Sequence, residues 1–181
     1  MLLYKLLTDR YPEIDITDMP YSRRAGNYLK GLQSAAKISI ADNYLFDRSF
    51  DVLNDCFGKT YRAWMKAFCY LDEAKTIGVW FPKMAVIEYG IEQPQSKTKA
   101  WINTLSDDGT TIRMYSHTEQ TIGRGTDTHI TFAKFPGQPY KYIGTFVRDI
   151  EISRPDNHIF RRVAAEVNLS HWRTVNDNES I

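Results

Sequence analysis

The sequence contains little cysteine and no long apolar run. Its 181 residues include two cysteines, Cys56 and Cys69, thirteen residues apart and without a CxxC pair. This spacing excludes the common structural zinc sites, and buried thiols in a reducing compartment are the expected state. The apolar start of the chain meets Lys5 and Asp9 too early for a secretory signal, and no segment has the length of a membrane helix. We therefore expect a cytoplasmic protein with no membrane partner.

Net charge is nearly absent too, at +1, so the chain lacks the strongly basic balance of a nonspecific nucleic-acid binder. The charge is unevenly spread, however. Residues 59–101 carry seven Lys and Arg against four Asp and Glu, and residues 120–173 carry eight against five. Two mildly basic zones could form one patch on the folded protein. Aromatic residues, at 13%, are numerous enough for a core and a binding surface.

Catalytic motifs are missing from the chain. It has neither the acid-x-Lys strand of a common magnesium-dependent nuclease nor a serine or cysteine nucleophile elbow, and the "GRG" at 123–125 is not a phosphate loop. His129 begins "HIT", which matches one HxT element of phosphoesterases that use two, but no second element follows His117. We expect no catalytic residue, metal or cofactor. A small phosphoesterase or nuclease that uses His117 and His129 is an alternative.

Helical spacing dominates the first third of the chain. "SRRAGNYLKGLQSAAKISIA" predicts a helix capped by Ser22, and "DRSFDVLNDCFG" predicts a second one that ends at Gly58. "YRAWMKAFCYL" fits a helix and a strand equally well. These patterns predict a helical N-terminal part over residues 1–74.

Strand patterns follow. "TIGVWFPKMAVI" is β-branched and aromatic, "AWINTLSDDGTTIRMYSH" predicts a hairpin that turns at Gly109, and "HITFAKF" and "YKYIGTFVRDIEI" predict further strands. "IFRRVAAEVNL" fits a strand or a helix. We expect an α+β protein in which N-terminal helices pack on a C-terminal curved antiparallel sheet or barrel of residues 75–173. The two parts would form one compact unit, with a flexible tail at 174–181.

The segment "HITFAKFPGQPYKYIGTFVRD", residues 129–149, has two interpretations. Strand alternation places Tyr140, Tyr142, Gly144, Phe146 and Arg148 on one face. If this face is exposed, its rings suit stacked bases, and nearby Arg and Lys suit phosphates. If it is buried, it packs beneath the N-terminal helices.

A family resemblance favours nucleic acid. The order of "KAWINTLSDDGTTIRMYSH", "YKYIGTFVRDIEIS" and "HIFRRVAAEV" resembles the PUA-like β-barrel domains that accompany bacterial restriction endonucleases. The resemblance covers roughly residues 75–170. It implies a module that binds nucleic acid, DNA rather than RNA, and that recognises a modified base in a restriction or defence setting. Because no attached nuclease domain is evident, it also implies a separate effector protein.

The same resemblance implies which residues act. The base pocket would contain aromatic rings from Trp80, Trp101, Tyr115, Tyr140 and Tyr142. The nucleic-acid backbone would be contacted by Arg124, Lys134, Arg148, Arg161 and Arg162. A different interpretation is an accessory protein of a phage or defence system whose aromatic sheet binds another protein.

Overall fold

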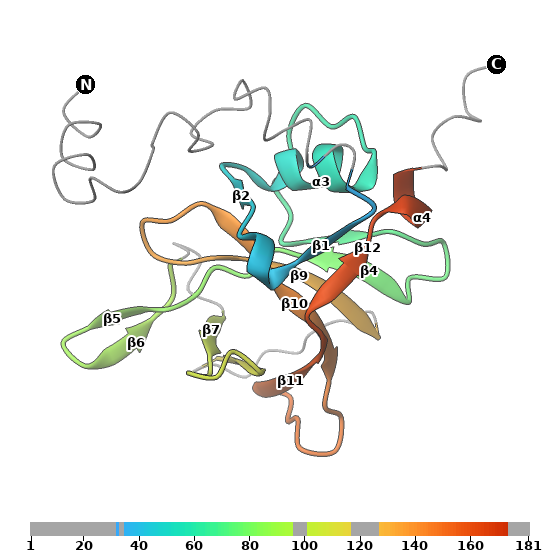
Figure 1. The fold of residues 1–181 in the computed structure, drawn as a ribbon. Helices are drawn as coiled ribbons and strands as arrows, with labels where there is room; N and C mark the ends of the chain where they lie inside the picture. The colour runs from blue at the N-terminus through green and yellow to red at the C-terminus, as the bar shows by residue number, and fades with distance from the viewer. Residues whose placement is uncertain (1–31, 33–34, 96–100, 117–126, 174–181) are drawn as a thin grey trace, which may run out of the picture. The chain divides into compact units, whose positions relative to one another are not determined.

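The structure is a computed structural model that describes residues 32, 35–95, 101–116 and 127–173 (Figure 1). The chain divides into two compact units, Met1–Ala35 and Ala36–Ile181, and every element named below belongs to the second. Within the described part of the chain, no helix is both long and apolar enough to cross a membrane.

An eight-stranded sheet organises the second unit. Seven strands lie in the order β3-β4-β9-β10-β11-β8-β7, and β2 pairs with the start of β10. All these pairs are antiparallel except β4 with β9. The strands are β2 (Leu45–Phe46), β3 (Phe68–Tyr70), β4 (Ile77–Trp80), β7 (Ile102–Leu105), β8 (Thr111–Tyr115), β9 (Thr128–Lys134), β10 (Tyr140–Arg148) and β11 (Asn157–Ala164).

Two small sheets and three short helices complete the unit. β1 (Lys37–Ser39) pairs with β12 (Glu166–Asn168), and β5 (Val86–Glu88) pairs with β6 (Ile91–Gln93). The helices are η1 (Ile40–Asp42), α3 (Ser49–Phe57) and α4 (Ser170–Arg173). The fold is therefore mostly β-sheet, and among the described residues the sheets do not close into the barrel that was one expectation.

The expected helical N-terminal part is wrong for the residues that the structure describes. Between residues 35 and 74 the chain forms one α-helix, α3, together with β1, β2 and β3. The "KIS" of the first expected helix is β1 instead, because Ile38 pairs with Val167 of β12 and tertiary pairing outweighs helical spacing. Most of that expected helix, and the tail at 174–181, lie outside the described residues. The division between residues 74 and 75, which lie between the paired strands β3 and β4, stays a prediction.

Other local expectations are confirmed. α3 ends at Gly58, whose φ of 62° is left-handed, and its N–H donates to the Leu53 carbonyl. β7 and β8 form the hairpin that turns at Gly109, with φ 68°. The segment "IFRRVAAEVNL", which fitted a strand or a helix, begins within a strand, β11, because it pairs with β10 on one side and β8 on the other.

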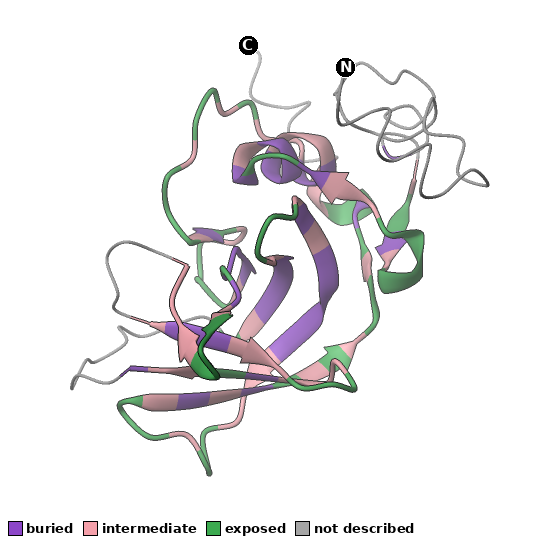
Figure 2. Ribbon diagram, turned by 90° about the vertical axis from the view of Figure 1, so that its left-hand side faces the viewer, coloured by how far each residue is buried: buried purple, intermediate pink, exposed green. Residues whose placement is uncertain are grey.

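Side chains pack on both faces of the central strands. Figure 2 shows burial concentrated in these strands and in α3. On one face, Phe57 of α3 and Phe46 of β2 meet Phe132 of β9 at ring-centroid distances of 6.2 and 5.6 Å. The other face carries a cluster formed by Trp80, Met84, Ile112, Ala133, Ile143, Phe146 and Phe160. Helix α3 thus covers the sheet, as an amphipathic helix should.

β10 is buried along most of its length, as the packing interpretation of residues 129–149 expected, but Phe146 packs in the cluster on the face away from α3 and not beneath N-terminal helices. Tyr140, Tyr142, Ile143 and Phe146 are buried, and Ile143 joins Phe146 in one cluster because a β-bulge between Tyr142 and Gly144 shifts the alternation. The bulge requires glycine. Gly144 has φ 125°, and a Cβ there would lie 2.5 Å from Cδ of Arg162.

His129 is also a core residue. Its ring packs against Phe68, Trp80 and Phe160, and 6% of the residue is exposed. Burial lowers the pKa of His129 to about 4, because desolvation disfavours the imidazolium. This environment does not suit an accessible acid or base, so the structure gives no support to the phosphoesterase alternative. His117 lies outside the described residues.

Candidate nucleic-acid interface

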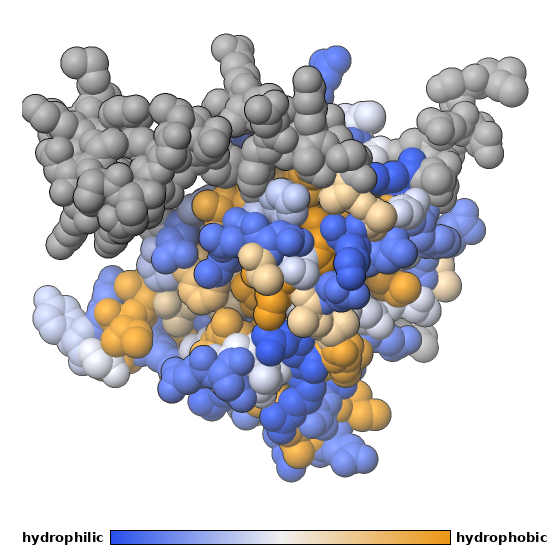
Figure 3. All heavy atoms as spheres, viewed as in Figure 1, coloured by the Kyte–Doolittle hydropathy of each residue, from blue (hydrophilic) through white to orange (hydrophobic). Residues whose placement is uncertain are grey.

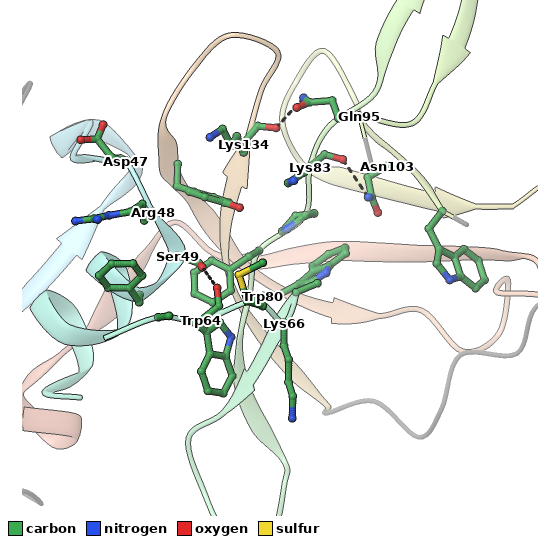
Figure 4. A pocket seen from close by; sticks show the side chains of 18 of the residues that line it. Asp47, Arg48, Ser49, Trp64, Lys66, Trp80, Lys83, Gln95, Asn103 and Lys134 are labelled. Carbon is green, nitrogen blue, oxygen red and sulfur yellow. Dashed lines mark hydrogen bonds between the residues drawn. The ribbon is translucent and has the colours of Figure 1, made fainter. Parts of the chain in front are cut away.

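A cavity of about 770 Å³ lies where β4 and β9 end and where β7 and β10 begin (Figure 4). The start of α3 and the loop before β3 form its other side. The residues that line it are Asp47, Arg48, Ser49, Phe50, Ala63, Trp64, Met65, Lys66, Ala67, Trp80, Phe81, Pro82, Lys83, Gln95, Trp101, Asn103, Met114, Lys134 and Tyr140. Its size is within the range of small-molecule sites.

Three tryptophans contribute to the wall, and each is held by a second ring. Trp64 packs on Tyr61 at 4.8 Å. Trp80 packs on Phe160 at 4.8 Å, and Trp101 packs on His158 at 5.6 Å. Large, fixed π-faces of this kind are suited to stacking with a planar base.

The segment after β4 joins distant strands beside the cavity. The Met84 N–H donates to the Lys134 carbonyl at 2.9 Å, and the Ala85 N–H donates to the Asn103 carbonyl at 2.8 Å. The Gln95 side chain donates to the same Lys134 carbonyl at 3.1 Å. These bonds bring the start of β7 and the end of β9 to one site.

Asn103 presents an unpaired acceptor. Its Nδ2 donates to the Lys83 carbonyl at 3.1 Å, as Figure 4 shows, but its Oδ1 has no hydrogen-bond partner among the described residues. Asn103 is 8% exposed, and this oxygen is itself buried. The indole N–H of Trp64 is also buried, and it too has no hydrogen-bond partner among the described residues. Two residues of the cavity lining, Asn103 and Trp64, therefore each carry a buried polar atom that lacks a partner among the described residues.

Positive charge surrounds the opening. Arg48, Lys66 and Lys83 are exposed, and Lys134 is half-buried with its ammonium 5.3 Å from the centre of the Tyr140 ring. Asp47 is the one carboxylate in the lining. The lining thus has four cations against one anion, although Arg48 is also ion-paired with Asp51 at 3.3 Å. This balance suits a polyanion at the rim, since Lys and Arg neutralise phosphates.

Four of the residues that the sequence predicted for the site lie together at this cavity, and they are Trp80, Trp101, Lys134 and Tyr140. Tyr115 lies elsewhere, where its hydroxyl donates to Glu92 at 2.6 Å and its ring lies under Arg113. Burial, with Glu92, raises the pKa of Tyr115 to about 12. Tyr142 is buried and hydrogen-bonded to Thr145 at 3.0 Å.

The other predicted cations are not part of the lining. Arg148 is on β10, and Arg161 and Arg162 are on β11. Arg161 lies 3.5 Å from the Asp149 carboxylate and donates to the Thr111 hydroxyl at 3.0 Å. Arg124 is outside the described residues. DNA contact by these arginines stays a prediction.

Sequence reasoning missed several lining residues. Arg48, Trp64, Lys66, Lys83 and Asn103 were not candidates. Three of them, Trp64, Lys66 and Lys83, lie in the first basic zone, residues 59–101, so uneven charge was the usable signal. Within the described residues, no group of three or more His, Cys, Asp and Glu could hold a metal ion.

Comparison with known families agrees with this architecture. The model of the SRA domain, the "SET and RING associated domain", matches residues 31–169. The chain belongs to the SRA family. An SRA domain binds DNA and recognises modified cytosine, so the PUA-like resemblance and the expected modified-base recognition are confirmed.

A solved structure shows the same fold as this SRA domain. "The 5-Hydroxymethylcytosine-Specific Restriction Enzyme AbaSI" superposes with a TM-score of 0.61 and 23% sequence identity, over 92% of this chain and 53% of that one. The chain thus spans about half the length of AbaSI. No protein of curated function matches the sequence.

Proposed function

We propose that this SRA domain holds a C5-modified cytosine, extruded from DNA, in the cavity between Trp64, Trp80 and Trp101. The observation that carries the proposal is the unpaired Asn103 Oδ1 in the lining of this aromatic cavity. A buried acceptor without a partner costs about 1–3 kcal/mol, and the exocyclic amino group of cytosine is a donor that would supply one. Stacking on the tryptophans offsets the few kcal/mol of base extrusion.

The rim supports the same proposal. Arg48, Lys66, Lys83 and Lys134 would neutralise phosphates on either side of the extruded nucleotide. Phosphate contacts of this kind give affinity and position without reading sequence. Base identity would be read inside the cavity instead.

We place this recognition in a restriction setting, because AbaSI shares the fold and is a restriction enzyme specific for 5-hydroxymethylcytosine. We also propose that a separate effector protein carries out the response to recognition. DNA bearing 5-hydroxymethylcytosine is accordingly the first ligand to test.

The test is fluorescence anisotropy with duplexes that carry cytosine, 5-methylcytosine or 5-hydroxymethylcytosine at one position. We expect the chain to prefer a modified duplex. Asn103→Leu, which removes the acceptor at similar size, should weaken modified-duplex binding by about tenfold, the scale of one buried hydrogen bond. Gln138→Leu, on the exposed turn before β10, is the matched control and should bind like the wild type. Equal affinity of the wild type for all three duplexes would refute the proposal.

A further inference from the structure

The loop between α3 and β3 carries an unusual side chain at the mouth of the cavity. Met65 belongs to the lining, yet it is 96% exposed. Its neighbour Trp64 is turned inward, with its indole N–H buried. An apolar side chain held fully in water, next to a site for a planar ligand, gains free energy if a partner covers it.

Helix α3 fixes this loop in place. The Asn54 side chain donates to the Tyr61 carbonyl and accepts from the Tyr61 N–H, both at 2.9 Å. The Ser49 hydroxyl donates to the Trp64 carbonyl at 3.0 Å. The Tyr61 and Trp64 rings stack between these two attachments. Met65 is therefore presented by an ordered backbone, so little ordering entropy remains to be lost on binding.

The charge around Met65 indicates which partner covers it. Residues 59–66, "KTYRAWMK", contain Lys59, Arg62 and Lys66 and no acidic residue, and Arg62 and Lys66 are exposed. An apolar tip between cations fits a nucleic acid, whose phosphates lie on either side of its stacked bases.

Two other exposed apolar sites differ in charge. The β5–β6 hairpin, whose apolar side chains are visible in Figure 3, carries Glu88 between Ile87 and Tyr89. Ile150, 75% exposed, lies between Asp149 and Glu151. Carboxylates beside these side chains would repel DNA.

We propose that Met65 is a wedge that enters the base stack of duplex DNA beside the cavity. This inference rests on the proposed function, since the wedge would hold open the space that the extruded cytosine leaves. Insertion of an apolar side chain between bases costs unstacking, which burial of the methionine and the phosphate contacts of Arg62 and Lys66 offset.

The experiment uses the full chain and a duplex with one 5-hydroxymethylcytosine and 2-aminopurine as its 3′ neighbour. Wild-type binding should raise the 2-aminopurine fluorescence, because the wedge unstacks that base. Met65→Ala should lose this rise and weaken duplex binding by about tenfold, the scale of one buried apolar side chain. Its affinity for the same strand without a complement should be unchanged, because no duplex stack has to open.

Two variants make the result specific. Ile150→Ala removes another largely exposed apolar side chain, outside the cavity lining, and should match the wild type in both measurements. Met65→Leu retains apolar volume and should restore most of the fluorescence rise. The wedge is refuted if Met65→Ala binds and unstacks the duplex like the wild type, or if it loses duplex and single-strand binding equally.

The same data separate this inference from the proposed function. Suppose that the wild type prefers the modified duplex, that Asn103→Leu abolishes this preference and that Met65→Ala changes nothing. The wedge is then refuted, and the proposed base cavity is supported. If the wild type shows no preference for modified DNA, both fall together.

Discussion

The hydroxyl of Ser49 donates a hydrogen bond of 3.0 Å to the main-chain carbonyl of Trp64. Ser49 is the first residue of α3 and is buried, so the start of the helix and the wall of the cavity form one structural unit. A helix whose apolar face packs on the sheet thereby also positions an aromatic ring at the proposed base cavity. Packing and recognition are coupled through this bond.

Replacement of Ser49 by alanine should therefore affect both stability and binding. The Trp64 carbonyl would lose this donor, and we expect the free energy of unfolding to fall by about 1 kcal/mol. Affinity for modified duplex should also fall, because Trp64 is no longer held. Urea unfolding and anisotropy measure the two effects. Thr60→Ala, an exposed change in the same loop, should leave both near wild type.

Local sequence signals predicted the parts of the fold that local physics determines. Helix α3 and the β7–β8 hairpin follow from apolar spacing and from Gly58 and Gly109, which accept left-handed backbone at their ends. Residues 37–39 were predicted as helix but form a strand, and the β11 segment fitted a strand and a helix equally well, since Ile38 and Phe160 owe their conformation to partners far along the chain. Helical spacing in one segment cannot reveal such partners.

The candidate site was predicted only in part for the same reason. Trp80, Trp101 and Tyr140 attract attention as aromatic residues, but Asn103 does not stand out in "WINTL". It becomes informative only in the folded chain, where the segment after β4 runs beside β7 and the Asn103 amide nitrogen donates to the Lys83 carbonyl, so that only its oxygen is left unpaired. The arginines of β11 stood out in the sequence, yet they lie away from the cavity lining.

Buried His129 predicts a loss of stability in mild acid. Its pKa of about 4 in the folded state lies below the value of about 6.5 expected when unfolded. Above pH 6.5 the imidazole is neutral in both states and has no effect. As the pH falls below 6.5, the unfolded state binds a proton that the folded state does not. Stability should therefore decrease, by about 2 kcal/mol at pH 5.

Urea unfolding at pH 7 and pH 5 measures this loss, and His129→Leu should reduce it. Part should remain, because burial also lowers the pKa of His158 in the same direction. A wild-type stability that is equal at both pH values would contradict the buried, neutral His129.

Gly144 predicts a second, larger stability effect. Gly144→Ala introduces a side chain at φ 125° and places its Cβ 2.5 Å from Cδ of Arg162. Backbone strain and overpacking together should lower the free energy of unfolding by about 2–4 kcal/mol. Gly137→Ala is the matched control, since Gly137 also has positive φ, at 70°, but has no atom within 4 Å of the added Cβ. It should cost about 1 kcal/mol. Similar losses for the two variants would show that the bulge is not tightly packed.

The salt dependence of DNA binding distinguishes the rim of the cavity from the arginines of β11. Lys83→Ala combined with Lys134→Ala should reduce the slope of log K against log salt by about 2, because each phosphate contact releases close to one counterion. The preference for modified over unmodified duplex should persist, since neither lysine reads the base. Arg161→Ala combined with Arg162→Ala tests the predicted DNA contact of these arginines, and we expect it to lower the slope by less, because Arg161 is already engaged by Asp149 and Thr111. Anisotropy titrations over several salt concentrations give both slopes, with unfolding curves to confirm that each variant is folded. If the arginine variant lowered the slope more than the lysine variant, the DNA backbone would have to be placed along β11 and not along the cavity rim.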